Sequence, residues 1–160
     1  MKIIKEIFIT LVLFFMVSEV VNFIRKPDIQ ENIYKYGLDD IKGNSVDFSN
    51  YKGEPLIVHF WGTWCPVCQL EASNIQALSQ KNNLISIAVN SGTNETIEAF
   101  MRQKHLDYRV INDEKGTLAK KFNITAYPST LIYNAKGELK FTEVGYSTTL
   151  GLQARIELIK

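Results

Sequence analysis

The chain contains only two cysteines, Cys65 and Cys68, and both lie in the motif Cys65-Pro66-Val67-Cys68. A disulfide across so short a loop would stabilise the fold little, by roughly 2 kcal/mol, whereas bridges across long loops gain more than twice that. Two thiolates could also form part of a Cu(I) or zinc site, but there is no second cysteine pair, and the only histidines, His59 and His105, are far apart in the chain. The motif therefore favours thiol-disulfide exchange over a structural disulfide or a metal site.

The residues on either side of the motif are suited to position a reactive sulfur. The uninterrupted apolar run 56–61 predicts a strand that is buried on both faces, and Pro66 opens a predicted helix that continues to about residue 81. Cys65 then falls at the N-cap, where free N–H groups and the helix dipole stabilise a thiolate. Pro66 suits the first helical position because it has no N–H to satisfy.

The remaining pattern predicts an α/β domain with a mixed central sheet flanked by helices. Two short strands surround a turn within 38–46, and a turn at 134–137 joins the last two strands. The other predicted strands are 84–89, 108–111, 130–133 and 139–144, and the other predicted helices are 93–104, 116–122 and 149–160.

Three segments are expected along the 160 residues: a membrane anchor at 1–26, a linker at 27–36 and a globular domain at 37–160. The anchor's apolar run is about 22 residues, or roughly 33 Å as a helix, which is close to the thickness of a hydrocarbon core. No small-residue cleavage site follows it, so a retained anchor is favoured over a cleaved signal peptide. Basic residues flank both ends and leave its orientation open.

The overall charge excludes one class of partner. Eighteen basic residues nearly balance 17 acidic ones. No net field would therefore attract nucleic acid.

The segment 58–68, VHFWGTWCPVC, resembles the active-site segment of the membrane-anchored thioredoxin-like proteins of bacteria, the TlpA type. It is most similar to the branch named suppressor of copper sensitivity protein D. Further similarity lies in 89–92 (VNSG), 110–113 (VIND) and 143–148 (EVGYST). The resemblance implies a thioredoxin fold at the bacterial inner membrane, with a single N-terminal transmembrane helix and the catalytic domain facing the periplasm.

The resemblance also implies roles for individual residues. Cys65 attacks a protein disulfide and Cys68 resolves the mixed disulfide, with electrons arriving from a transmembrane thiol carrier and no bound cofactor or metal. It implies that Pro128 forms a cis peptide bond opposite the two cysteines, although from the residues alone Pro128 could simply open a strand. The residues expected to contact substrate are Trp64, Pro66, Val67 and Tyr127.

His59 and Glu71 are candidates for proton transfer. His59 stands six residues before Cys65, where thioredoxins carry a buried aspartate, and imidazole titrates near neutral pH. It could equally be a hydrogen-bonded core residue. Glu71 shares the inward helical face with Cys68, and a buried carboxylate is costly unless it is used, although the helix dipole alone also favours an acid there.

The predicted function is reduction of protein disulfides, with a link to copper tolerance suggested by the resemblance. Pro-Val between the cysteines lacks the histidine of strongly oxidising sites. Two alternatives stay open: a Cu(I)-binding module that uses the two thiolates, and a thiol reductant for cytochrome c maturation. Segment 124–129 lacks the Gly-rich, acidic loop found near the proline in the cytochrome group.

Overall fold

The computed structural model describes residues 32–160, together with residues 6, 9, 10, 12 and 13. Most of the expected membrane anchor, 1–26, therefore lies outside the described residues, as does 27–31 of the expected linker. None of the helices within the described part combines the length and the apolar content that a membrane crossing requires. Ile33, in the rest of the expected linker, is fully buried and packs in the core of the domain.

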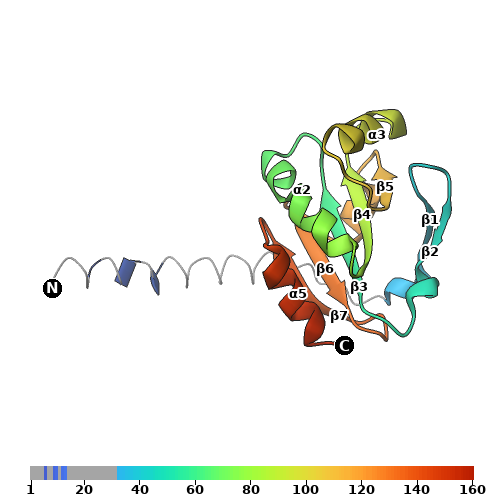
Figure 1. Ribbon diagram of the computed structural model, residues 1–160. Coiled ribbons are helices and arrows are strands. Elements are labelled where there is room, and N and C mark those ends of the chain that lie inside the picture. Colours follow the sequence, from blue (N-terminus) through green and yellow to red (C-terminus); the bar gives the residue numbers. More distant parts are fainter. Residues whose placement is uncertain (1–5, 7–8, 11, 14–31) are drawn as a thin grey trace.

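A five-stranded mixed sheet forms the centre of the molecule, in the order β5-β4-β3-β6-β7 (Figure 1). β3 is parallel to β4, β4 is parallel to β5, and β6 is antiparallel to both β3 and β7. Every residue of β3 is buried, which confirms the prediction of a central strand. The strands are β3 (Leu56–Trp61), β4 (Asn83–Val89), β5 (Val110–Asp113), β6 (Ser129–Tyr133) and β7 (Leu139–Val144).

Helices cover both faces of this sheet, so the expected mixed sheet with flanking helices is confirmed. One apolar cluster lies between the sheet and three helices, α2 (Pro66–Ser79), α3 (Asn94–Gln103) and α5 (Thr149–Glu157). A second cluster lies on the opposite face, which is covered by the short elements η1 (Ile33–Lys35), β1 (Gly37–Asp39), β2 (Ser45–Asp47), η2 (Phe48–Tyr51) and α4 (Thr117–Lys121). Because side chains alternate along β3, Ile57, His59 and Trp61 face the first cluster and α2.

One strand is shifted from its predicted position. The pattern predicted a strand at 108–111, but β5 begins at Val110. Before it, the backbone N–H of Asp107 donates to Oε1 of Gln76 on α2 at 2.9 Å, and the Tyr108 side chain packs inward against Trp61. These contacts hold 107–108 outside the ladder, and they involve residues far apart in the sequence.

Candidate active site

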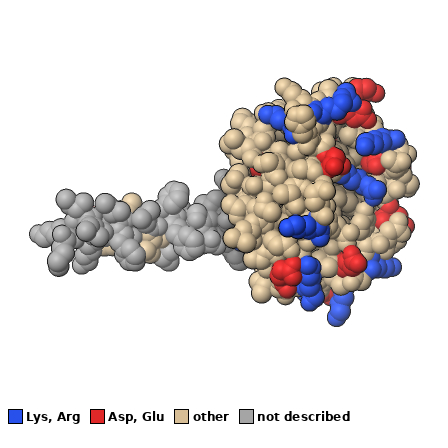
Figure 2. Space-filling model, in the orientation of Figure 1, with Lys and Arg blue, Asp and Glu red and all other residues tan. Residues whose placement is uncertain are grey.

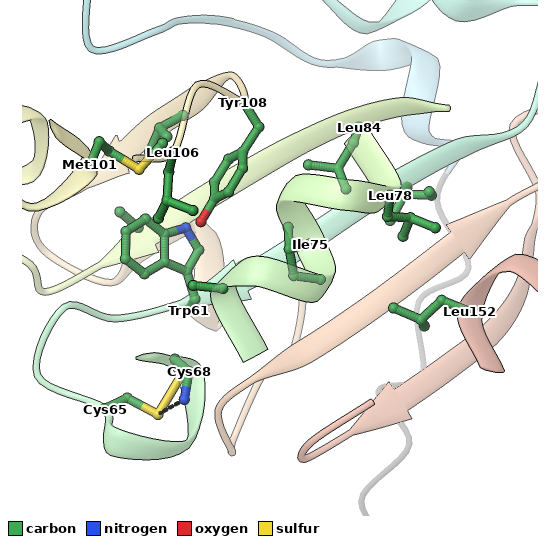
Figure 3. Close-up of a cluster of buried hydrophobic side chains, with 14 of the residues drawn as sticks. Trp61, Cys65, Cys68, Ile75, Leu78, Leu84, Met101, Leu106, Tyr108 and Leu152 are labelled. Atoms are coloured by element: carbon green, nitrogen blue, oxygen red, sulfur yellow. Dashed lines mark hydrogen bonds between the residues drawn. A yellow bond between two sulfur atoms is a disulfide. The ribbon is translucent and has the colours of Figure 1, made fainter. Parts of the chain in front are cut away.

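The two cysteines lie where β3 ends and α2 begins, and they form a disulfide. Cys65 is the N-cap of α2, and its Sγ accepts a hydrogen bond from the backbone N–H of Cys68 at 3.2 Å. Figure 3 shows this pair at the end of the buried cluster that contains Trp61 and Ile75. In the reduced protein, the same N–H and the positive end of the helix dipole would stabilise a Cys65 thiolate.

The rim of the disulfide is formed by residues that the sequence analysis expected to contact substrate. Trp64, Pro66 and Val67 are exposed, whereas both cysteines are buried. The Trp64 indole is held in place because its Nε1 donates to the carbonyl oxygen of Val89 at 3.0 Å. Gly62 leaves room for the ring, since a Cβ there would lie 2.6 Å from the Trp64 side chain.

The loop before β6 lies beside the disulfide. The Tyr127–Pro128 peptide bond is cis, as the resemblance implied. The Tyr127 carbonyl oxygen lies 3.8 Å from Sγ of Cys65, and the Tyr127 ring meets the Trp64 ring edge-on at 5.5 Å between centroids. Pro128 itself is buried. Residues from two distant segments that are expected to contact substrate are thereby brought together at one sulfur.

Glu71 lies on the buried side of α2, one turn after Cys68, and its side chain is fully buried. Oε1 accepts a hydrogen bond from the backbone N–H of Ser147 at 2.7 Å, but Oε2 has no hydrogen-bond partner. Burial raises the pKa of Glu71 to about 7, and the Ser147 hydrogen bond opposes this shift. A carboxyl group that can take up or release a proton near neutral pH thus stands behind the disulfide.

His59 faces Glu71 from the central strand. Its Nε2 lies 3.9 Å from the unpartnered Oε2 of Glu71, and its Nδ1 lies 2.9 Å from Oγ1 of Thr130. Burial lowers the pKa of His59 to about 3, so the ring is neutral at physiological pH. His59 is thus a hydrogen-bonded core residue that also lies beside the titratable carboxyl group, and its role in proton transfer stays a prediction.

Two residues of this site were missed by sequence reasoning. Thr130 lies directly opposite His59 in the antiparallel pairing of β3 with β6, and Ser147 lies in the loop that follows β7. The register of β6 against β3 would have identified Thr130. No local signal marks Ser147, because it contributes a backbone N–H rather than its side chain.

The described residues contain no group of three or more His, Cys, Asp or Glu side chains arranged to hold a metal ion. His105, the other histidine, follows α3 and has a positive φ of 54°, away from the disulfide. Any metal bound at Cys65 and Cys68 would therefore depend on the two sulfurs and on ligands from outside this part of the chain.

This geometry agrees with comparisons to known proteins. The model of the AhpC/TSA family matches residues 27–142. The chain belongs to the AhpC/TSA family. Sporulation thiol-disulfide oxidoreductase A of Bacillus subtilis is 33% identical over 115 residues, which cover 68% of this chain and 69% of that protein. The thiol-disulfide oxidoreductase ResA of Geobacillus kaustophilus is 28% identical over 127 residues, which cover 77% of this chain and 73% of the relative.

Solved structures of disulfide oxidoreductases share the fold of this chain. StoA from Bacillus subtilis superposes with a TM-score of 0.66 at 27% identity, over 75% of this chain and 94% of that chain. A secreted disulfide oxidoreductase of Mycobacterium tuberculosis shares the fold, with a TM-score of 0.70 at 20% identity over 81% and 99% of the two chains. This family member is a thioredoxin-like thiol-disulfide oxidoreductase with a Cys65–Cys68 disulfide.

Proposed function

We propose that this oxidoreductase reduces protein disulfides outside the cytoplasm, with Cys65 as the attacking sulfur and Cys68 as the resolving one. The observation that carries the proposal is the position of Cys65 at the N-cap of α2, beside the Tyr127–Pro128 loop and below an exposed rim. Cys68 lies within the first turn, one residue in from the rim formed by Val67. The two sulfurs therefore differ in how strongly the start of α2 stabilises a thiolate and in how directly a substrate can reach them.

The proposed reaction consumes the reduced enzyme and produces the disulfide form. The Cys65 thiolate attacks one sulfur of the substrate disulfide, so a mixed disulfide forms and the first substrate thiolate leaves. Cys68 then loses its proton and attacks Sγ of Cys65. The second substrate thiolate leaves, the enzyme closes its Cys65–Cys68 bond, and two electrons have passed to the substrate. A transmembrane thiol carrier would restore the dithiol.

Glu71 would accept the Cys68 proton in this scheme. A carboxyl group with a pKa of about 7 is suited to general base catalysis near neutral pH. His59 would support the ionised state of Glu71. If the Thr130 hydroxyl donates to Nδ1, the single proton of the neutral ring lies on Nε2 and points toward Oε2 of Glu71. This assignment places a donor 3.9 Å from the buried oxygen of Glu71 that lacks a hydrogen-bond partner.

Single-cysteine variants test the assignment of the two sulfurs. Incubated with a protein disulfide, Cys68→Ser should accumulate a mixed disulfide that reducing agents release, because it can attack but cannot resolve. Cys65→Ser should accumulate none and should not reduce insulin. If Cys65→Ser reduces insulin at the wild-type rate, the proposed chemistry is wrong.

The reduction potential tests the direction of the reaction. Equilibration with glutathione buffers should give a value near that of thioredoxin, about −270 mV, for a reductase. A value near about −120 mV would instead identify an oxidase.

The proposed location rests on the sequence of 1–26, whose apolar run has a membrane-spanning length and lacks a cleavage site. In this arrangement 1–26 is an anchor, and the domain, which includes the buried Ile33 from the expected linker 27–36, faces the periplasm. Membrane fractions should retain the protein after a high-salt wash, and a protease added to spheroplasts should digest it. Release into the soluble fraction, or protection from the protease, would contradict the proposal.

The finer assignments depend on the sequence resemblance. The resemblance suggests that the reductase serves copper tolerance, and the alternative of a Cu(I)-binding module requires the reduced sulfurs to hold copper tightly. Titration of the dithiol with Cu(I) separates the binding module from a reductase: stoichiometric tight binding without disulfide turnover would favour the binding module. Reduction of apocytochrome c before haem attachment shares the proposed chemistry and is tested by comparing apocytochrome c with insulin as substrate.

A further inference from the structure

The end of the sheet opposite the disulfide carries the N-terminal attachment of the domain. β3 ends beside the disulfide, and β6, which is antiparallel to β3, runs from there to the turn 134–138. Asn32, where the continuous described part of the chain begins, donates from Nδ2 to the carbonyl oxygen of Lys136 at 3.0 Å. The N–H of Ile33 donates to the carbonyl oxygen of Gly137 at 3.4 Å. The six residues of β3 separate this end from the disulfide by roughly 17 Å.

Two adjoining hollows at this end are lined by lysines. The first contains Asn32 and Ala135 together with three lysines, and none of the described residues that line it is acidic. The second shares Ala135 and contains two further lysines and one acid, Glu54, whose carboxylate accepts a hydrogen bond from Asn83 at 2.7 Å. We call the five exposed lysines of the two hollows the lysine cluster; they are Lys35, Lys52, Lys81, Lys136 and Lys160.

Most of the positive charge of the lysine cluster is not neutralised by neighbouring acids. Lys160 pairs with Glu157 at 2.6 Å, and the nearby Glu138 pairs with Lys140 at 2.9 Å. The other four members form no salt bridge with any residue of the described part. Figure 2 shows lysine and arginine side chains along the lower side of the molecule, with acids among them, where Figure 1 places the end of α5 and the β6–β7 turn. The whole chain has a net charge of only +1, so the excess is local.

Helix dipoles account for only part of the lysine cluster. Lys81 and Lys160 follow α2 and α5, and the C-terminal end of an α-helix favours positive charge. Lys35 and Lys52 lie at the ends of η1 and η2, which have only three and four residues. Lys136 lies in the turn between two strands. The three lysines nearest Asn32 therefore have no long helix to complement, and their common feature is their position at the attachment point.

The length of the chain before Asn32 limits the distance between the lysine cluster and a membrane. The proposed anchor ends at residue 26, and a chain from 26 to 32 spans at most about 20 Å when fully extended. The anchor would therefore keep the cluster at a high local concentration beside the lipid surface. Each lysine that reaches an anionic surface strengthens binding roughly fivefold. Leu158, which follows α5 at the same end and is 77% exposed, is suited to the apolar boundary beneath the headgroups.

We propose that the lysine cluster binds the anionic headgroups of the membrane that holds the anchor. The proposal rests on the proposed location of the chain and adds an interaction surface to it. The lysine cluster and the disulfide lie at opposite ends of the sheet. Binding at the cluster therefore directs the disulfide away from the bilayer, toward substrates in the periplasm. Because the attraction is between exposed charges, it should weaken as the salt concentration rises.

Acetylation of lysines on the full chain in lipid vesicles tests the proposal. Sulfo-N-hydroxysuccinimide acetate does not cross the bilayer, and mass spectrometry gives its rate of reaction at each lysine. Lys35, Lys52 and Lys136 should react at least about fivefold more slowly in phosphatidylcholine vesicles that contain phosphatidylglycerol than in phosphatidylcholine alone. High salt should remove the difference. Lys115, which is exposed after β5 at the disulfide end, should react equally in both and is the internal control. Equal rates at all four lysines would overturn the proposal.

Charge reversal provides a matched pair of variants. Lys35→Glu combined with Lys136→Glu should abolish the lipid-dependent protection of Lys52. Lys115→Glu combined with Lys120→Glu changes the total charge equally at exposed residues away from the cluster and should keep that protection. The first variant should reduce insulin in detergent at the wild-type rate, which shows that it is folded. If Lys52 stays protected in this folded variant, the lysine cluster is not the lipid contact.

A high-salt wash of the vesicles separates this proposal from the proposed location. If the washed vesicles retain the chain and yet its lysines react equally with both lipids, the anchor stands and the lysine cluster does not bind lipid. If the wash removes the chain, the anchor itself is wrong and the proposal is wrong with it. If heparin protects the cluster and phosphatidylglycerol does not, the partner is a soluble polyanion, and lipid binding is wrong.

Discussion

Replacing Glu71 with glutamine should change how the stability of the folded protein depends on pH. The pKa of Glu71 is raised from 4.5 to about 7, chiefly by burial. Between these two pH values the folded protein holds a proton that the unfolded chain has released. The stability contributed by Glu71 therefore falls as pH rises through this window. The total loss is about 3 kcal/mol, at about 1.4 kcal/mol for each pH unit.

His59 has the opposite effect over an overlapping range. Its pKa is lowered from 6.5 to about 3 by burial, so between these values the unfolded chain holds a proton that the folded protein lacks. Stability from His59 therefore increases with pH up to 6.5. From pH 4.5 to 6.5 the contributions of Glu71 and His59 cancel in the wild type. Only a variant that lacks one of these two titrating groups reveals the stability contribution of the other group.

Urea denaturation of the oxidised protein, followed by tryptophan fluorescence, measures this effect. Glutamine keeps a carbonyl oxygen to accept the hydrogen bond from Ser147 and removes the titration. The difference in unfolding free energy, Glu71→Gln minus wild type, should increase by about 3 kcal/mol from pH 4.5 to 7. A difference that is constant over this range would show that Glu71 titrates normally, and the argument for its role as a base near neutral pH would fail.

The remaining predictions concern His59, the Trp64 side chain at the rim of the disulfide, and the start of α4. His59→Asn should leave only the Glu71 contribution, so its stability should fall by about 3 kcal/mol over the same pH range in the same urea assay. Gly62→Ala places a Cβ against Trp64, which should shift tryptophan emission; loss of the indole hydrogen bond, worth about 1 kcal/mol, predicts roughly fivefold lower kcat/KM with insulin. Asp113→Ala leaves buried N–H groups at the start of α4 unpaired and should cost about 2 kcal/mol in urea denaturation, whereas Asp113→Asn retains an acceptor and should cost less.

Local patterns were sufficient to predict the position of the reactive sulfurs. The apolar run of β3 could only be buried on both faces, and a proline directly after Cys65 fixes the start of a helix. These two signals act within a dozen residues and need no tertiary contact. Boundaries that depend on distant residues were less accurate, as the start of β5 shows: the contact of Asp107 with Gln76 across 31 positions decides it.

The setting of Glu71 could not be predicted in the same way, because its groups come from three separate parts of the chain. Helical periodicity predicts that Glu71 lies on the inward face of α2. It does not predict the hydrogen bond from the N–H of Ser147, which lies 76 positions later in the chain. Likewise, the sequence shows a histidine in a buried strand and a threonine after Pro128, and only the pairing of β3 with β6 makes them partners. Local sequence thus specifies where the disulfide forms, whereas the long-range register of the sheet specifies that Thr130 lies beside His59. Substitutions at Thr130 or His59 should accordingly alter proton transfer while leaving the Cys65–Cys68 loop in place.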